Sequence, residues 1–387
     1  MLIASIEAQS ILNIYFKLGE FDMCDRHGNY MQNVEELKSK LKSKSRRTFL
    51  KGASAASVAA LLPMSFAAAL NPTASWAASS TVIKATHGTG FCNLGLFLVK
   101  ERGLTKEDGV ELNFVVTPSN ADIVTLFGAG LVDISMIPYS QFITLYDAGA
   151  PVKIVAGGGV EGCMIVVKEG IKSAADLRGK TLGTFQADTL EVLPYDYLKQ
   201  AGMTFQDLDV RYFNTSPEMA QAFINGAIDA MCHIEPYASQ SLASREGASI
   251  LSDGTDLYGK GYADCVLAVR TPLLEKNPAA IKTIIKAMLL AQSQAEADPE
   301  AALKDTVGKY YKTTMEAARD ASNKQPVKID QRDQTTFILE RGQSLKELGY
   351  IKKLPDDNAI DWTLLEEVIA ENTALYDSLK LKSAGVA

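Results

Sequence analysis

Polar side chains recur in this sequence where an apolar, strand-like run gives way to a helix-like run. Helix N-termini carry free N–H groups and a positive dipole end, which suit an anionic or carbonyl-bearing ligand. In sheets of alternating strands and helices, ligands bind in the crevice at the carboxyl ends of the strands. These residues therefore indicate reversible binding through hydrogen bonds. The candidate binding residues are His87, Thr89, Asn120, Tyr139, Ser140 and Glu161 in the first half of the chain, and Gln186, Asp188, Thr189, Asn214, Glu235 and Tyr237 in the second.

Several of these candidates also have a purely structural interpretation. Asp188 or Thr189 could cap the helix that follows, and Asn214 precedes a helix in the same way. Glu235 could be a solvated turn residue, and His87 could support the site without touching a ligand. Both interpretations stay open for each residue.

Cysteine and histidine are too sparse for the common catalytic and metal patterns. Beyond residue 77 the cysteines are Cys92, Cys163, Cys232 and Cys265, and no CxxC spacing occurs. We therefore expect no structural zinc, no other metal and no cofactor. No Ser-His-Asp or Cys-His pattern can be read, so we also expect no enzyme activity.

The elements that must position these residues alternate along the chain. Apolar strand-like runs occur in the first half at 81–85, 110–116, 133–137, 153–156 and 164–168, with helical spacing at 93–101 and 121–129. The pattern then repeats with strands at 180–185 and 210–213 and helices at 189–200 and 217–225. This alternation predicts doubly wound, mainly parallel α/β sheets. After residue 270 the spacing is mainly helical, at 279–297, 300–311, 330–348 and 363–379.

The repeated pattern predicts two lobes with a cleft between them. We expect the first lobe over 78–170, the second over 171–263, and a return to the first lobe with C-terminal helices over 264–387. Connections near 167–174 and 264–269 would make a hinged clamp. Cys163 and Cys265 fall at equivalent places in the two crossing strands and could form a disulfide.

A paired arginine marks the beginning of the chain. Residues 45–51 read Ser-Arg-Arg-Thr-Phe-Leu-Lys and precede a mildly apolar run that ends at residue 70. This is similar to a twin-arginine export signal, with cleavage after Ala77 and a periplasmic location. A membrane anchor is the alternative, but the run is rich in Ala, Ser and Gly. We interpret residues 1–77 as a leader. Residues 1–30 are interpreted as the product of a misassigned start codon, because a leader that begins at Met31 or Met23 would have a more ordinary length.

The charge balance excludes several partners. Nine of the 39 Lys and Arg residues and six of the 46 Asp and Glu residues lie in 1–77, so the remainder carries a net charge near −10. An acidic chain is a poor candidate for binding nucleic acid or anionic membranes. We expect a monomer.

Four segments together resemble the periplasmic solute-binding proteins of the nitrate/sulfonate/taurine and thiamine-pyrimidine transport type. They are residues 127–134 (FGAGLVDI), 149–156 (GAPVKIVA), 173–183 (SAADLRGKTLG) and 220–230 (AQAFINGAIDA), the last followed by Glu-Pro-Tyr-Ala at 235–238. The resemblance covers nearly all of 81–300. It implies a type II periplasmic binding fold that captures a small solute for an ABC importer, with a permease and an ATPase as partners.

The charges of the candidate binding residues indicate the class of ligand. No Lys or Arg stands among the candidate positions, whereas Glu161, Asp188 and Glu235 do. These acids would repel a sulfonate or nitrate, so we favour a neutral or cationic solute such as an aminopyrimidine or amine. A sulfonate, nitrate or taurine ligand held by backbone amides is the alternative. A thiamine-pyrimidine synthase-like enzyme, or a partner of a TRAP transporter or membrane sensor, are alternatives from other classes.

Overall fold

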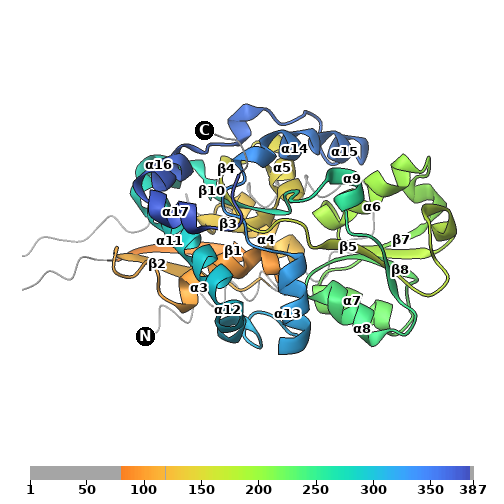
Figure 1. Cartoon of the computed structure of the whole chain (residues 1–387). Helices are drawn as coiled ribbons and strands as arrows, with labels where there is room; N and C mark the ends of the chain where they lie inside the picture. Colours follow the sequence, from red (N-terminus) through yellow and green to blue (C-terminus); the bar gives the residue numbers. More distant parts are fainter. Residues whose placement is uncertain (1–79, 118, 384–387) are drawn as a thin grey trace, which may run out of the picture. The chain divides into compact units, whose positions relative to one another are not determined.

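Two five-stranded sheets, each flanked by helices, organise the chain (Figure 1). The computed structural model describes residues 80–117 and 119–383, which belong to a single compact unit. The predicted export signal and its cleavage point lie outside these residues. No helix within the described ranges is both long and apolar enough to cross a lipid bilayer.

The first sheet has the strand order β2-β1-β3-β10-β4. Its strands are β1 (Thr81–His87), β2 (Val110–Phe114), β3 (Ile134–Pro138), β4 (Val152–Gly157) and β10 (Cys265–Arg270). β1 pairs in parallel with β2 and β3, whereas β10 runs antiparallel to β3 and β4. The helices between these strands are α3 (Leu94–Glu101), α4 (Asn120–Ala129) and α5 (Tyr139–Asp147). We call this sheet and its helices the first lobe.

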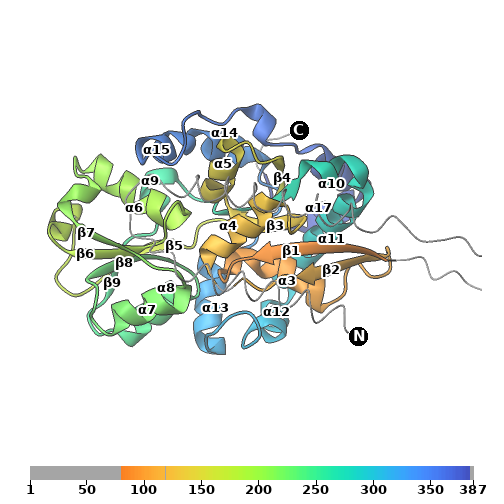
Figure 2. The same ribbon diagram turned by 180° about the vertical axis from the view of Figure 1, so that it is seen from behind.

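The second sheet repeats the plan with the order β7-β6-β8-β5-β9 (Figure 2). Its strands are β5 (Cys163–Val167), β6 (Thr181–Thr184), β7 (Asp209–Tyr212), β8 (Ala230–Ile234) and β9 (Ser249–Ser252). The helices of this second lobe are α6 (Thr189–Gln200), α7 (Ser216–Ile224), α8 (Tyr237–Ser244) and α9 (Thr255–Tyr258). β5 is the reversed strand here, antiparallel to β8 and β9. Each sheet is thus mixed, with four strands in one direction and one reversed strand that has just crossed from the other lobe.

The connections between the lobes differ from those we expected. β5 belongs to the second sheet, because Cys163 pairs with Ile234 and Val167 with Ala230. The first connection is therefore 158–162 rather than 167–174, and the second is 259–264, directly before β10. The expected end of the first lobe, at residue 170, was too late. The apolar run of β5 suits a buried strand of either sheet, and only its pairing with β8 assigns β5 to the second sheet.

The C-terminal region packs on the first lobe and also reaches the second. Its long helix α11 (Pro278–Ala297) shares a hydrophobic core with α3 and β1. Contacts with the second lobe come from α13 (Met315–Lys324), where the Lys324 ammonium donates to Ser239 Oγ at 2.8 Å, and from α15 (Gly342–Glu347), where the Ser344 hydroxyl donates to Asp196 at 2.7 Å. The remaining helices are α10 (Thr271–Lys276), α12 (Pro299–Thr306), α14 (Thr335–Glu340), α16 (Thr363–Glu371) and α17 (Thr373–Ser378). Single-turn 3-10 helices are η1 (Phe91–Asn93), η2 (Ala174–Leu177), η3 (Phe205–Asp207), η4 (Arg332–Gln334) and η5 (Asp357–Ala359).

Candidate functional site

A small pocket lies between the lobes and is lined from both sheets. Its volume is about 40 Å³, room for a few water-sized groups. The first lobe supplies the turn after β1 and the starts of α4 and α5, while the second lobe supplies the starts of α6 and α7. The polar lining residues are Thr89, Cys92, Asn93, Asn120, Gln141, Asp188, Thr189, Ser216, Asp264 and Cys265.

Asp188 is a buried carboxylate that faces both lobes. One oxygen caps α6 by accepting the Leu190 N–H at 3.1 Å. The other accepts hydrogen bonds from first-lobe amides, at 2.9 Å from Gln141 and 3.4 Å from Asn120. Burial raises the pKa of Asp188 to about 7, although these bonds favour the charged form. Asp188 therefore caps α6 with one oxygen, as the structural interpretation expected, and joins the two lobes at the pocket with the other.

Asp264 is a second buried carboxylate, at the end of the second connection. Its Oδ1 accepts a hydrogen bond from the Thr189 hydroxyl at 2.8 Å, and its Oδ2 accepts one from the Gln325 amide at 2.9 Å. The Cys163 thiol lies 3.3 Å from Oδ1. Burial raises the pKa of Asp264 as well. None of the described residues that line the pocket is Lys, Arg or His, so its two carboxylates have no cationic partner there.

The pocket presents hydrogen-bond acceptors that lack a cationic partner among the described lining residues, and several of its donors are already engaged. The amide groups of Asn120 and Gln141 already donate to Asp188, and the Thr89 hydroxyl donates to Ser216 Oγ at 3.0 Å. The buried Oε1 of Gln141 has no hydrogen-bond partner among the described residues. The two carboxylates and the Gln141 Oε1 can therefore accept hydrogen bonds from the donor groups of a ligand.

Four sequence-predicted residues line the pocket together: Thr89, Asn120, Asp188 and Thr189. The other eight do not line it. Gln186 and Asn214 are exposed, and the carbonyl of Asn214 accepts the N–H of the lining residue Asn120 at 3.3 Å.

The remaining first-lobe candidates serve packing and the connections. The half-buried ring of His87 packs edge-on against Phe97, and burial lowers the pKa of this histidine. Tyr139 and Ser140 are buried at the start of α5. Glu161 lies in the first connection, where its Oε1 accepts the Gly261 N–H at 2.6 Å, so it links the first connection to the second.

The last two second-lobe candidates are core residues. Glu235 is fully buried and accepts hydrogen bonds from the backbone N–H of Ser239 at 3.0 Å and from its hydroxyl at 2.7 Å. It is not a solvated turn residue. Tyr237 is buried and stacks on the ring of His233, with 5.1 Å between ring centroids.

Cys163 and Cys265 form no disulfide in the structure, although we expected that they could. All four described cysteines are buried free thiols, and Asp264 lies between Cys163 and Cys265 and accepts a hydrogen bond from each. The sulfur that faces Cys265 is that of Cys92, at 2.7 Å.

Sequence reasoning missed Asn93, Gln141, Ser216, Asp264 and the two pocket cysteines as binding residues. Gln141 and Ser216 stand in the first turns of α5 and α7, one residue beyond the candidate Ser140 and two beyond Asn214, so a slightly wider search would have included them. Asp264 had no such signal, because it precedes a strand and only the insertion of β10 into the first sheet brings it to the pocket.

The fold is that of the type II periplasmic binding proteins, as expected. The periplasmic nitrate-binding protein of Synechocystis superposes with a TM-score of 0.65 at 17% identity, covering 78% of this chain and 92% of that one. The family model described as "NMT1/THI5 like" matches residues 92–302. The chain belongs to this family, which confirms the resemblance that its motifs indicated.

Two curated relatives that align with a little more than half of this chain are named for different activities, one for binding and one for catalysis. A putative aliphatic sulfonates-binding protein of Escherichia coli is 31% identical over 217 residues, which span 53% of this chain and 66% of that protein. A 4-amino-5-hydroxymethyl-2-methylpyrimidine phosphate synthase of Saccharomyces cerevisiae is 24% identical over 229 residues, 56% of this chain and 66% of that enzyme. The chain thus aligns with slightly less than two thirds of each relative.

Proposed function

We propose that this protein is the periplasmic solute-binding component of an ABC importer. It captures a small neutral or cationic organic solute, such as an amine or aminopyrimidine, between its lobes and delivers it to a permease and its ATPase. The observation that carries the ligand class is the pair of buried carboxylates, Asp188 and Asp264, in a pocket whose described lining holds no Lys, Arg or His. An ion pair with a cationic ligand would offset the cost of burying these acids.

Capture is proposed to work by hinge closure about the two connections, 158–162 and 259–264. A pocket of about 40 Å³ is far smaller than the several hundred Å³ typical of sites for organic ligands. An organic solute therefore requires the lobes to separate before it enters. Two chain connections between compact lobes permit such a motion.

Delivery to the periplasm is proposed to use the paired arginines at Arg46 and Arg47. The relatives named as periplasmic or sulfonate-binding proteins support this location. Replacing both arginines by lysine should leave the protein in the cytoplasmic fraction. Unchanged export of that variant would count against the twin-arginine route.

A sulfonate or nitrate ligand is the second candidate, because two of the similar proteins are named for these anions.

Catalysis is less well supported. Burial raises the pKa of the Cys92 thiol to about 11, which disfavours a thiolate nucleophile. The two described histidines, His87 and His233, are outside the pocket lining.

A thermal-shift screen distinguishes the ligand classes. Amines, aminopyrimidines, sulfonates and nitrate are each added to the purified protein; a ligand at a hundred times its Kd adds about 2.7 kcal/mol of stability. We expect the cationic and donor-rich compounds to stabilise, and Asp188→Asn to weaken that effect. The exposed Asp209→Asn in β7 serves as the matched control. Stabilisation by sulfonate or nitrate that Asp188→Asn does not reduce would overturn the proposed ligand class.

A further inference from the structure

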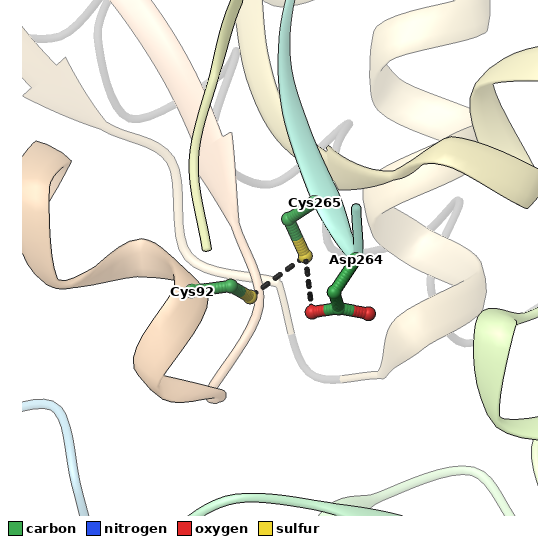
Figure 3. A group of neighbouring side chains, drawn as sticks. All are labelled: Cys92, Asp264 and Cys265. Atoms are coloured by element: carbon green, nitrogen blue, oxygen red, sulfur yellow. Dashed lines mark hydrogen bonds between the residues drawn. The ribbon is translucent and has the colours of Figure 1, made fainter. Parts of the chain in front are cut away.

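Three side chains on one wall of the pocket form a compact group of potential metal ligands (Figure 3). Cys92 comes from η1, Asp264 ends the second connection and Cys265 begins β10. The Cys265 sulfur lies 2.7 Å from the Cys92 sulfur and 3.2 Å from Asp264 Oδ2. One ligand atom from each residue falls within 4.8 Å of the others, and all three residues are buried.

The fold holds these residues together although 173 positions separate the cysteines. β10 inserts between β3 and β4, which brings Cys265 beside the turn that follows β1. The first connection between the lobes also lies against Cys92. A Cβ added to Gly159 in this connection would be 2.5 Å from the Cys92 Cα. Only glycine fits at that approach, so Cys92 is confined against the chain that links the lobes.

We propose that Cys92, Asp264 and Cys265 bind a thiophilic divalent cation of the zinc class. Two sulfurs and one carboxylate oxygen are ligands that Zn²⁺ accepts, whereas Mg²⁺ and Ca²⁺ require oxygen throughout. Tetrahedral Zn–S bonds of about 2.3 Å place two sulfurs roughly 3.8 Å apart. The two thiols therefore need to separate by about 1 Å, which small side-chain rotations supply.

The surroundings of Asp264 suit a metal ligand. Gln325 and Thr189 donate hydrogen bonds to its two oxygens, and such contacts orient a ligating carboxylate. Three protein ligands leave a fourth position of a tetrahedral ion, and all three residues line the pocket. That position is open to water or to a donor atom of a bound solute. The inference concerns these three residues alone and holds whether or not the protein serves a transporter.

The test uses the full chain, reduced and freed of metal with a chelator, and titrated with Zn²⁺ and Co²⁺. We expect one equivalent of each to bind, with sulfur-to-cobalt charge-transfer absorption that signals two thiolates. Cys92→Ala and Cys265→Ala should each lower Zn²⁺ affinity by at least about a hundredfold, since losing a supporting contact alone costs 10- to 100-fold. Asp264→Asn should weaken binding but keep the absorption of both sulfurs.

Cys232→Ala is the matched control, because Cys232 is a buried thiol of β8 outside the group. It should bind Zn²⁺ as the unchanged protein does. Near-ultraviolet circular dichroism establishes that each variant is folded. If a cysteine variant does not fold, the cobalt spectrum of the unchanged protein decides. Absence of the sulfur band in fully reduced protein, or Zn²⁺ binding that survives Cys92→Ala and Cys265→Ala, overturns the proposal.

Discussion

The side-chain amide of Gln141 donates a hydrogen bond to Asp188 Oδ2 at 2.9 Å and so joins the start of α5 in the first lobe to the start of α6 in the second. Both residues are buried. The opposite oxygen of Asp188 caps α6 through Leu190 N–H, so the same carboxylate fixes a helix end and a contact between lobes. A ligand that displaces Gln141 from Oδ2 would therefore weaken the contact between the lobes and leave the cap at Oδ1 in place.

Removing this contact should favour separation of the lobes. In Gln141→Ala the Asp188 carboxylate loses a donor, and a hydrogen bond to a charged group contributes about 1.5–3 kcal/mol. The balance between open and closed forms should then shift at least about tenfold towards open. Small-angle scattering of the ligand-free protein should give a larger radius of gyration.

Gln221→Ala is the control for that experiment, because Gln221 is exposed in α7 and makes no side-chain hydrogen bond among the described residues. Its scattering should match that of the unchanged protein. Equal radii for Gln141→Ala and Gln221→Ala would show that the Gln141–Asp188 contact does not hold the lobes together.

Glu191 should make stability fall as pH rises. It is buried, and burial raises its pKa to about 7, although it accepts hydrogen bonds from the Ala187 N–H at 2.7 Å and the Tyr350 hydroxyl at 3.0 Å. A raised folded-state pKa means that its stabilisation is complete below the unfolded pKa of about 4.3 and is lost as pH rises through about 7. The free energy of unfolding should fall between pH of about 6 and 8.5. In Glu191→Gln this fall should be smaller by about 1 kcal/mol than in the unchanged protein.

Denaturant unfolding at several pH values measures this effect. Glu347→Gln is the control, because hydrogen bonds lower the pKa of Glu347 to about 2. Its stabilisation is present above the unfolded pKa and is lost only in acid, so the slope between neutral and alkaline pH should not change. An identical pH slope for Glu191→Gln and the unchanged protein would place the pKa of Glu191 outside this range.

The local pattern of the chain predicted its elements well. The helix expected at 189–200 is α6 (Thr189–Gln200), and the strand expected at 110–116 is β2 (Val110–Phe114). Both predictions use the spacing of apolar residues and the turn or capping residues at the ends of the element. These signals depend only on residues a few positions apart in the sequence. Asp188 was found for the same reason, since it stands at a strand-to-helix corner. The helices α8 and α13 and the strand β9 were missed; β9 is short and partly exposed, so it carries no apolar run that marks a strand.

The rest of the pocket depends on contacts that no local pattern contains. Asp264 and Cys265 reach it because β10 returns to the first sheet and runs antiparallel between β3 and β4. Absence of a CxxC pair argued against a metal site, but that rule concerns ligands that are neighbours in sequence. Cys92 and Cys265 become neighbours only through the topology, and their relation to Asp264 required the folded chain.

Two ion pairs that attach the C-terminal region to α6 should differ sharply in strength. The Arg341 guanidinium lies 2.7 Å from Asp196, with side-chain exposures of 23% and 11%, whereas Lys199 and Glu347 are 53% and 29% exposed. Arg341→Met leaves a largely buried carboxylate without its cation and should cost about 2–3 kcal/mol of the free energy of unfolding. Lys199→Met should cost less than about 1 kcal/mol, because water screens an exposed pair. Denaturant unfolding of the two variants gives the comparison; equal losses would mean that solvent reaches Asp196 as freely as it reaches Glu347.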